Sequence, residues 1–229
     1  MEINLQSKIW VFAEQRQGQF ADVGLELLGK ALELGKSTGW KVALLMIGHQ
    51  LTEGCERLSR FGADEILVAD HRLLSDYCNQ TYTRVLEEAI RKYRPELFLL
   101  GATAMGTDLG ARLAARLRTG LSAHCIGLEL SPEGKLFAVV PGWGGNVLAT
   151  VHCPHTQPQM ATVMPGVFEI PPEKNFHSQI IPLDVHITQG DVTYQILEIR
   201  KEESQESSLE GAEVVIAGGW GIGSKKDWH

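Results

Sequence analysis

The glycine-rich turn at residues 218–224 is the part of the sequence whose residue types point most directly to chemistry. It reads Gly-Gly-Trp-Gly-Ile-Gly-Ser and follows an apolar run at residues 212–217. Because glycine lacks a Cβ, such a turn can approach a phosphate or a flavin closely, and a helix starting behind it would add a favourable dipole. A flexible tail is the alternative interpretation. We expect cofactor contacts, only within a complete cofactor domain, from Gly218, Gly219, Trp220, Gly221 and Ser224.

Residues 103–110 open a predicted helix directly after a strand and form the best internal place for a small ligand. Ligands of open α/β sheets bind beyond the carboxyl ends of the strands. The more common meaning of such a segment is a capped helix start, with Thr107 or Asp108 as the cap. Residues 14–19 contain one glycine and match neither G-x-G-x-x-G nor the P-loop, which argues against independent ATP or NAD chemistry.

His152, Cys153 and His155 place three possible metal ligands close together in the sequence. Structural zinc sites draw pairs of ligands from two separated segments, and here only His124 and Cys125 offer a second pair. His152 and Cys153 are neighbours at the end of a predicted strand and would face opposite sides. We therefore expect no metal site.

The sequence shows no arrangement typical of catalysis. No G-x-S-x-G motif or similar setting for a nucleophile accompanies its serine, histidine and aspartate residues. Glu14, Asp64 and Asp70 lie at predicted strand ends, where a solvated cap is the usual explanation. We expect no catalytic residues, and hence not a self-sufficient enzyme.

The composition is that of an ordinary globular protein. The chain has 229 residues, of which 44% are hydrophobic and 21% charged, and this length allows one large domain or one domain plus a fragment. The net charge of −7 argues against nucleic acid as a partner. No apolar run approaches the ~20 residues that span a bilayer, and the polar N-terminus lacks the features of a signal peptide.

The four cysteines lie far apart and form no CxxC pair. This spacing favours reduced thiols in a reducing compartment over a disulfide framework. We therefore expect a cytoplasmic protein, or a mature organellar one, that does not insert into a membrane. The cysteines are Cys55, Cys78, Cys125 and Cys153.

Short apolar runs alternate with helical patterns through the first half of the chain. Strands are predicted at residues 9–13, 41–47, 65–69 and 96–101. Helices are predicted at residues 25–35, 53–60, 82–90 and 107–117. This alternation predicts an α/β fold with a mostly parallel sheet that is covered by helices on both faces.

The second half predicts additional strands, some of them antiparallel, that extend or edge this sheet. Glycine and proline turns separate strand-like segments at residues 121–130, 136–140, 146–152, 159–163, 180–187 and 192–200. The polar residues 201–210 are predicted to be a linker. A strand at residues 213–217 then leads into the glycine turn. We predict one domain at residues 1–200, the linker at 201–210, and the truncated start of a cofactor-binding domain at 211–229.

Three segments carry a resemblance to a known family. Residues 101–130 contain GTDLGARLAARL and TGLSAHC, residues 141–168 contain GGNVLAT and PQMATVMPGVF, and residues 214–224 read VVIAGGWGIGS. These segments resemble the electron transfer flavoprotein alpha subunit, from its N-terminal domain to the start of its FAD-binding domain. The similarity spans nearly the whole chain and is most specific at residues 141–168.

The sequence departs from the family pattern at several positions. Thr107, Gln157, Met164 and Trp220 stand where the family usually has arginine, and His124 stands where it has aspartate. The lost arginines indicate a divergent member or altered contacts with a partner subunit.

The resemblance implies a Rossmann-like scaffold domain that packs against an electron transfer flavoprotein beta subunit. In the complete heterodimer, FAD bound mainly by the alpha C-terminal domain would carry electrons from dehydrogenases to an acceptor, and the flavin would supply the redox chemistry. We expect this chain alone to bind no FAD. The rival hypothesis is a stand-alone α/β protein that binds a small ligand or an adenine nucleotide in the crevice near Thr103.

Overall fold

The computed structural model describes residues 7–194, 196–199 and 214–223. The chain divides into two compact units, Met1–Gln195 and Ile196–His229, and each is described by itself. None of the helices in these described ranges is both long and apolar enough to cross a membrane.

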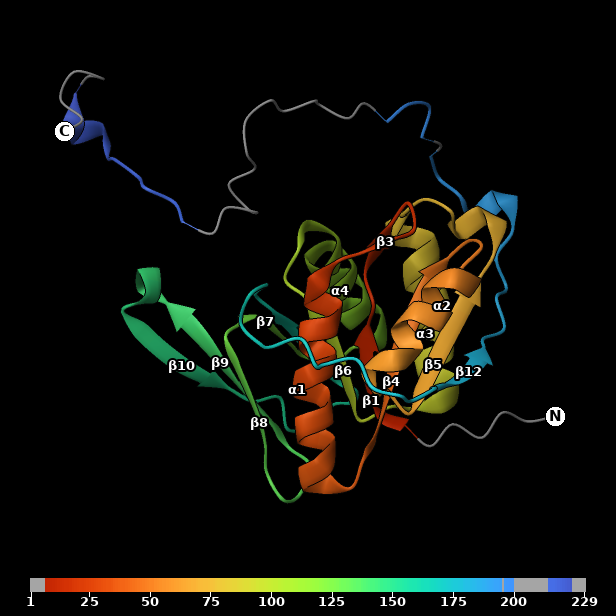
Figure 1. Ribbon diagram of the computed structural model, residues 1–229, viewed down its shortest axis with the longest axis horizontal. Coiled ribbons are helices and arrows are strands. Elements are labelled where there is room, and N and C mark those ends of the chain that lie inside the picture. Colours follow the sequence, from red (N-terminus) through yellow and green to blue (C-terminus); the bar gives the residue numbers. More distant parts are fainter. Residues whose placement is uncertain (1–6, 195, 200–213, 224–229) are drawn as a thin grey trace. The chain divides into compact units, whose positions relative to one another are not determined.

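The first unit is built on a sheet of seven strands (Figure 1). Every pairing between neighbouring strands in it is parallel. The expected Rossmann-like parallel sheet is therefore confirmed. In spatial order the strands are β12 (Gln179–Pro182), β5 (Glu65–Asp70), β4 (Lys41–Gly48), β1 (Ser7–Phe12), β6 (Leu97–Gly101), β11 (Gln159–Val163) and β7 (Leu121–Cys125).

Helices cover both faces of the sheet, as expected (Figure 1). Side chains of a strand alternate between the two faces, and in β1 the buried Ile9 and Val11 face one core while Trp10 and Phe12 face the other. The first core contains α1 (Asp22–Thr38) and α2 (Thr52–Leu58), and the second contains α3 (Asn79–Tyr93) and α4 (Ala104–Leu117). Burial on both faces explains why these strands are apolar throughout.

The strands of the second half are distributed differently from our expectation. The single strand expected at residues 121–130 is two strands that are separated by a bend at Ile126, and His124 just before it adopts a left-handed φ of 57°. Its first part, β7, joins the parallel sheet. Its second part, β8 (Gly127–Leu130), pairs antiparallel with β9 (Leu136–Gly142), which pairs with β10 (Val147–Val151). The antiparallel strands therefore form a separate sheet and do not extend the parallel one.

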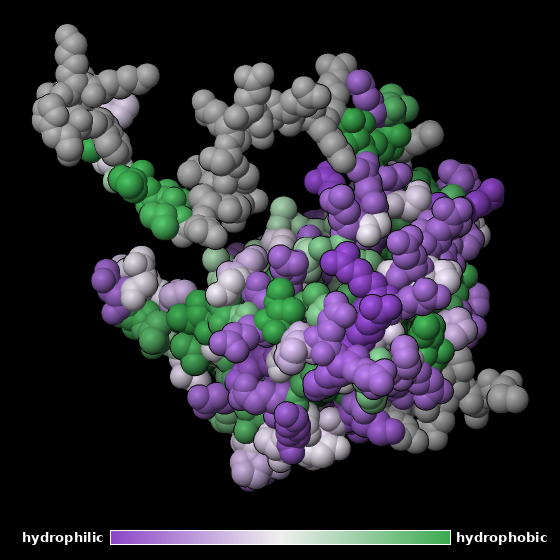
Figure 2. All heavy atoms as spheres, in the orientation of Figure 1, coloured by the Kyte–Doolittle hydropathy of each residue, from purple (hydrophilic) through white to green (hydrophobic). Residues whose placement is uncertain are grey.

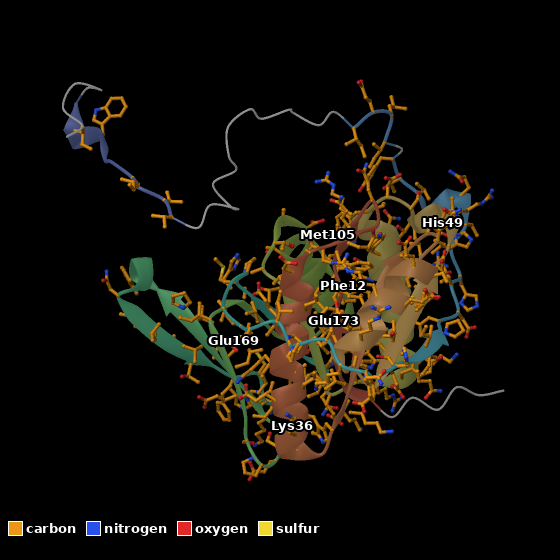
Figure 3. The ribbon with its side chains drawn as sticks, in the orientation of Figure 1. Phe12, Lys36, His49, Met105, Glu169 and Glu173 are labelled. Carbon is orange, nitrogen blue, oxygen red and sulfur yellow. The ribbon has the colours of Figure 1, made fainter. Side chains whose placement is uncertain are left out.

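A long connection after β11 crosses the molecule to the far edge strand β12 (Figures 1 and 3, with Glu169 and Glu173 labelled on it). It presses against α1 at Gly29, where a Cβ would lie 2.4 Å from the carbonyl oxygen of Glu169. Only glycine fits so close to another backbone. The connection is held further by the Gly166 amide, which donates to Glu26 Oε2 at 2.8 Å.

Two later strands expected from the sequence, at residues 192–200 and 213–217, are absent among the described residues, and another is shorter than expected. The segment expected at 180–187 is a strand only as far as Pro182. Residues 192–194 and 196–199 are not strand. Residues 214–217, within the strand expected at 213–217, are also irregular. The linker expected at 201–210 lies outside the described residues. After β12, residues 183–194 run along α3, and we call this segment the strap.

Candidate interaction surface

The antiparallel sheet of β8, β9 and β10, with its turn at residues 143–146, projects as an arm whose tip is apolar and exposed. Trp143 in the turn is 87% exposed, and Leu148 and Val147 in β10 are 62% and 51% exposed. Figure 2 shows hydrophobic residues, in green, along the arm and more hydrophilic residues at its end. Large exposed apolar side chains on a projecting element are typical of sites of interaction with other proteins.

The base of the arm is fixed to the parallel sheet. Leu128, Leu136 and Ala138 are buried in the core that also contains α1. The Gln159 side chain of β11 accepts from the Leu136 amide at 2.7 Å and donates to the Gly134 carbonyl oxygen at 2.9 Å. A rigid base and an exposed tip give the arm a defined direction, which preorganises it for docking.

The outer edge of β10 can accept another strand. Among the described residues β10 pairs with β9 alone, so its other side presents unpaired backbone N–H and C=O groups. Extended segments of partner proteins add to such edges through main-chain hydrogen bonds, and neighbouring side chains give specificity. Trp143 and Leu148 would supply those side-chain contacts.

The carboxyl edge of the parallel sheet contains the candidate ligand crevice. The chain passes from β1 through β4 to β5 on one side and returns to β6 on the other, so the strand order reverses between β1 and β6. Ligands of such folds bind at this reversal. Here Thr103 Oγ1 donates to Glu14 Oε2 at 2.5 Å and accepts from the Gly106 amide at 2.9 Å.

Two expectations about this edge were wrong. The cap of α4 is Thr103, whereas Thr107 and Asp108, expected in that role, lie inside the helix. Glu14 is not a solvated cap but a half-buried group whose pKa is raised by burial and partly lowered by its bond to Thr103. Sequence spacing could not show the pair, because Glu14 and Thr103 follow different strands and meet only in the folded sheet.

The protein's own groups make close contacts at the crevice. A Cβ on Gly106 would lie 2.0 Å from the Gly101 carbonyl oxygen, so the start of α4 packs directly on the end of β6. The Gln15 side chain donates to the Ile47 carbonyl oxygen at 3.0 Å and accepts from the Gly18 amide at 3.1 Å. These contacts use the polar groups that a ligand near Thr103 would need.

The two aspartates at strand ends behave as caps. Asp64 Oδ2 accepts from the Val42 amide at 2.9 Å. Asp70 accepts from the Gln50 and Leu51 amides at 3.0 and 2.8 Å. Burial acts to raise the pKa of Asp70, but these backbone hydrogen bonds and His49, labelled in Figure 3, lower it overall. Both carboxylates thus have a structural role.

His152 and Cys153, which we considered as metal ligands, each contact other parts of the protein. His152 Nδ1 lies 3.0 Å from the Leu136 carbonyl oxygen, and the ring stacks on Phe137 at 4.7 Å between centroids. Cys153 lies against Gly120, where a Cβ would be 2.4 Å from its sulfur. Among the described residues, no three histidine, cysteine, aspartate or glutamate side chains are grouped as a metal site would require.

The glycine turn of the second unit forms no pocket within residues 214–223. Trp220 is fully exposed, and a Cβ on Gly219 or Gly221 would meet no atom within 4 Å. Ser224 lies outside the described residues. FAD needs a pocket that buries most of its surface, so these turn residues do not by themselves fit the cofactor.

Comparison with known proteins agrees with the geometry. A family model described as "Electron transfer flavoprotein domain" matches residues 9–185. The electron transfer flavoprotein subunit alpha of Thermoanaerobacterium thermosaccharolyticum is 41% identical over 94% of this chain and 66% of its own length. Protein FixB of Clostridium saccharobutylicum is 41% identical over 96% and 66%. The acryloyl-CoA reductase electron transfer subunit beta of Anaerotignum propionicum is 33% identical over 96% and 67%.

The chain therefore spans about two thirds of the length of the relatives it matches. The match covers the parallel sheet from β1 to β12 and includes the whole arm. With a seven-stranded parallel sheet, helices on both faces and this extent of sequence identity, the chain belongs to the electron transfer flavoprotein family.

Proposed function

We propose that this chain provides the N-terminal scaffold and docking domain of an electron transfer flavoprotein alpha subunit. It would bind a beta subunit, and the heterodimer would pass electrons from dehydrogenases to an acceptor. The observation that carries the proposal is the arm, with a fixed base and an open apolar edge at β10. The relatives that are named as electron transfer subunits support it.

The chemistry in this proposal is electron carriage rather than catalysis by the chain's own side chains. FAD supplies one- and two-electron redox chemistry when it is bound, and a protein contributes binding, orientation and electrostatics. The turn at residues 218–223, whose Trp220 side chain is fully exposed, would contact FAD only together with further protein groups. We propose the domain boundaries 1–200, 201–210 and 211–229 on the same basis. The cytoplasmic location remains a prediction.

Size-exclusion chromatography and calorimetry with a purified beta subunit from the same genome test the docking role. We expect a one-to-one complex at micromolar concentration. Separate elution of the two chains would remove the main support for the proposal. The visible spectrum after incubation with FAD and desalting tests the assignment of the cofactor. We expect no retained flavin absorbance from this chain alone.

The rival function is a stand-alone protein that binds a small ligand or an adenine nucleotide near Thr103. The contacts among Glu14, Thr103 and Gly106 argue against it, because they occupy the polar groups at the strand-order reversal. Calorimetric titration with AMP and ATP distinguishes the two functions. Saturable binding that is lost in Thr103→Val would favour the rival.

A further inference from the structure

The strap is paired with α3 in a regular register. Asp184 contacts Lys92 at 2.8 Å, His186 contacts Glu88 at 3.4 Å, and Asp191 contacts Arg84. The three partners on α3 are four residues apart and therefore lie on one stripe of the helix. Along the strap the residue numbers increase while those of their partners on α3 decrease, so the strap runs antiparallel to α3.

The two halves of the strap are held by different forces. In the lower half Leu183 and Ile187 are buried in the core against α3, and Val185 packs beside them. The upper half, residues 188–194, contains no buried residue. Burial of aliphatic side chains contributes far more than an exposed ion pair. The lower half is therefore a fixed part of the fold, whereas the upper half relies on polar contacts and on the half-buried Val192.

Two residues latch the upper half. The Asp191 carboxylate accepts from the Thr188 amide and hydroxyl, both at 2.8 Å, and pairs with Arg84. The Tyr194 hydroxyl donates to the Tyr77 carbonyl oxygen at 2.9 Å. Each contact is exposed, so water and salt compete for it.

The upper half covers a thiol. Cys78 precedes α3 and is only 4% exposed. Tyr194 lies beside it, because its hydroxyl donates to the carbonyl oxygen of the preceding residue, Tyr77. Lifting residues 188–194 would remove that cover. Cys55 and Cys125 are equally buried but belong to the other core, away from the strap.

We propose that residues 188–194 form a clasp that opens while the rest of the fold stays intact, with Asp191 on Arg84 as its main latch. Opening exposes Cys78 and frees about 23 Å of chain, at roughly 3.3 Å per residue, where the polypeptide leaves the α/β unit. The consequence for a following domain rests on the proposed function, since only such a domain would gain reach. The opening itself does not depend on that function.

Alkylation of native cysteines by N-ethylmaleimide, followed by mass spectrometry of each cysteine peptide, tests the clasp in the isolated chain. Asp191→Asn removes the charge of the latch and leaves Tyr194 and the environment of the Cys78 thiol in place. We expect Cys78 to react about 5-fold faster in this variant, as loss of a surface ion pair allows at most. Cys55 and Cys125 should keep their slow rates.

Asp184→Asn is the matched control, because it removes a similar ion pair from the half that Leu183 and Ile187 hold. It should leave Cys78 unchanged. At about 1 M salt the Debye length is about 3 Å. Such salt should increase the alkylation rate of Cys78 in the wild type and have little effect on that rate in Asp191→Asn. An unchanged Cys78 rate in Asp191→Asn would overturn the clasp. So would acceleration of all three cysteines together, or an equal effect of Asp184→Asn.

Discussion

Two strands of nearly the same sequence have opposite fates in this protein. β11 reads Gln-Met-Ala-Thr-Val and is buried throughout, and Met160 is 1% exposed. β10 reads Val-Leu-Ala-Thr-Val and is exposed from Val147 to Thr150. The difference arises from their neighbours, since β11 lies between β6 and β7 under α4, whereas β10 is the outer strand of the arm.

An apolar strand is therefore not by itself a core strand. An exposed run such as β10 is a liability in an isolated chain, because open edges and apolar side chains favour association. A specific partner would convert that liability into an interface. The parallel sheet then serves as the rigid support, and the arm serves as the contact.

The largest expected effect separates the two strands by stability. Met160→Ala removes a fully buried side chain and should lower the free energy of unfolding by about 3 kcal/mol. Leu148→Ala, the equivalent position in β10, should change it by less than about 0.5 kcal/mol. Urea unfolding followed by circular dichroism measures both. Equal losses would mean that the arm is part of the core and would break the comparison.

The second prediction concerns binding, for which the exposed strand β10 should matter most. Leu148→Asp places a charge on the docking edge and should weaken affinity for the beta subunit by about 30-fold, equivalent to about 2 kcal/mol. Ile180→Asp is the control, since Ile180 is also exposed on an edge strand but lies in the parallel sheet. Calorimetry should show unchanged affinity for it. If Ile180→Asp weakens binding more than Leu148→Asp does, the beta subunit docks at the β12 edge and not on the arm.

The third effect tests the polar pair at the carboxyl edge. Thr103→Val removes the cap of α4 and the partner of Glu14, and should cost about 1 kcal/mol of unfolding free energy. Thr107→Val is matched to it, because Thr107 lies inside the same helix. We expect a smaller loss there in thermal or urea unfolding. A greater loss at Thr107 would contradict the cap assignment.

The smallest effect depends on pH. Because the pKa of Glu14 is raised in the fold, its favourable contribution is present below the unfolded pKa and is lost as pH rises through the folded value. Glu14→Gln should therefore gain in melting temperature relative to the wild type between pH 4 and pH 8. The gain should stay below about 3 °C, or about 1 kcal/mol, because the group is partly solvated.

Exposed Glu53→Gln serves as the control for this pH series and should show no such trend. If the melting temperature of Glu14→Gln relative to the wild type instead fell as pH rises, the prediction would have the wrong sign. Such a fall would mean that the ionised carboxylate is the form that the fold favours.

Residue pattern and motifs were enough to predict the parallel α/β fold, the helices on both faces and the family. Continuous apolar runs such as residues 41–47 and 96–101 are required by strands that are buried on both faces. The motifs at residues 141–168 carried the most specific part of the family resemblance. The exposure of Trp143 and Leu148, the proposed contact residues, carried no signal in the sequence, since exposed and buried apolar runs look alike there.

Only the tertiary structure decided where each strand of the second half goes and which polar groups meet. Local pattern fixes the period of an element, but the burial of β11 and the exposure of β10 depend on neighbours distant in the chain. The pairs Glu14 with Thr103 and Arg84 with Asp191 likewise join residues far apart in sequence. Sequence spacing is informative only within one helix or strand, because contacts between elements are set by how the whole chain packs.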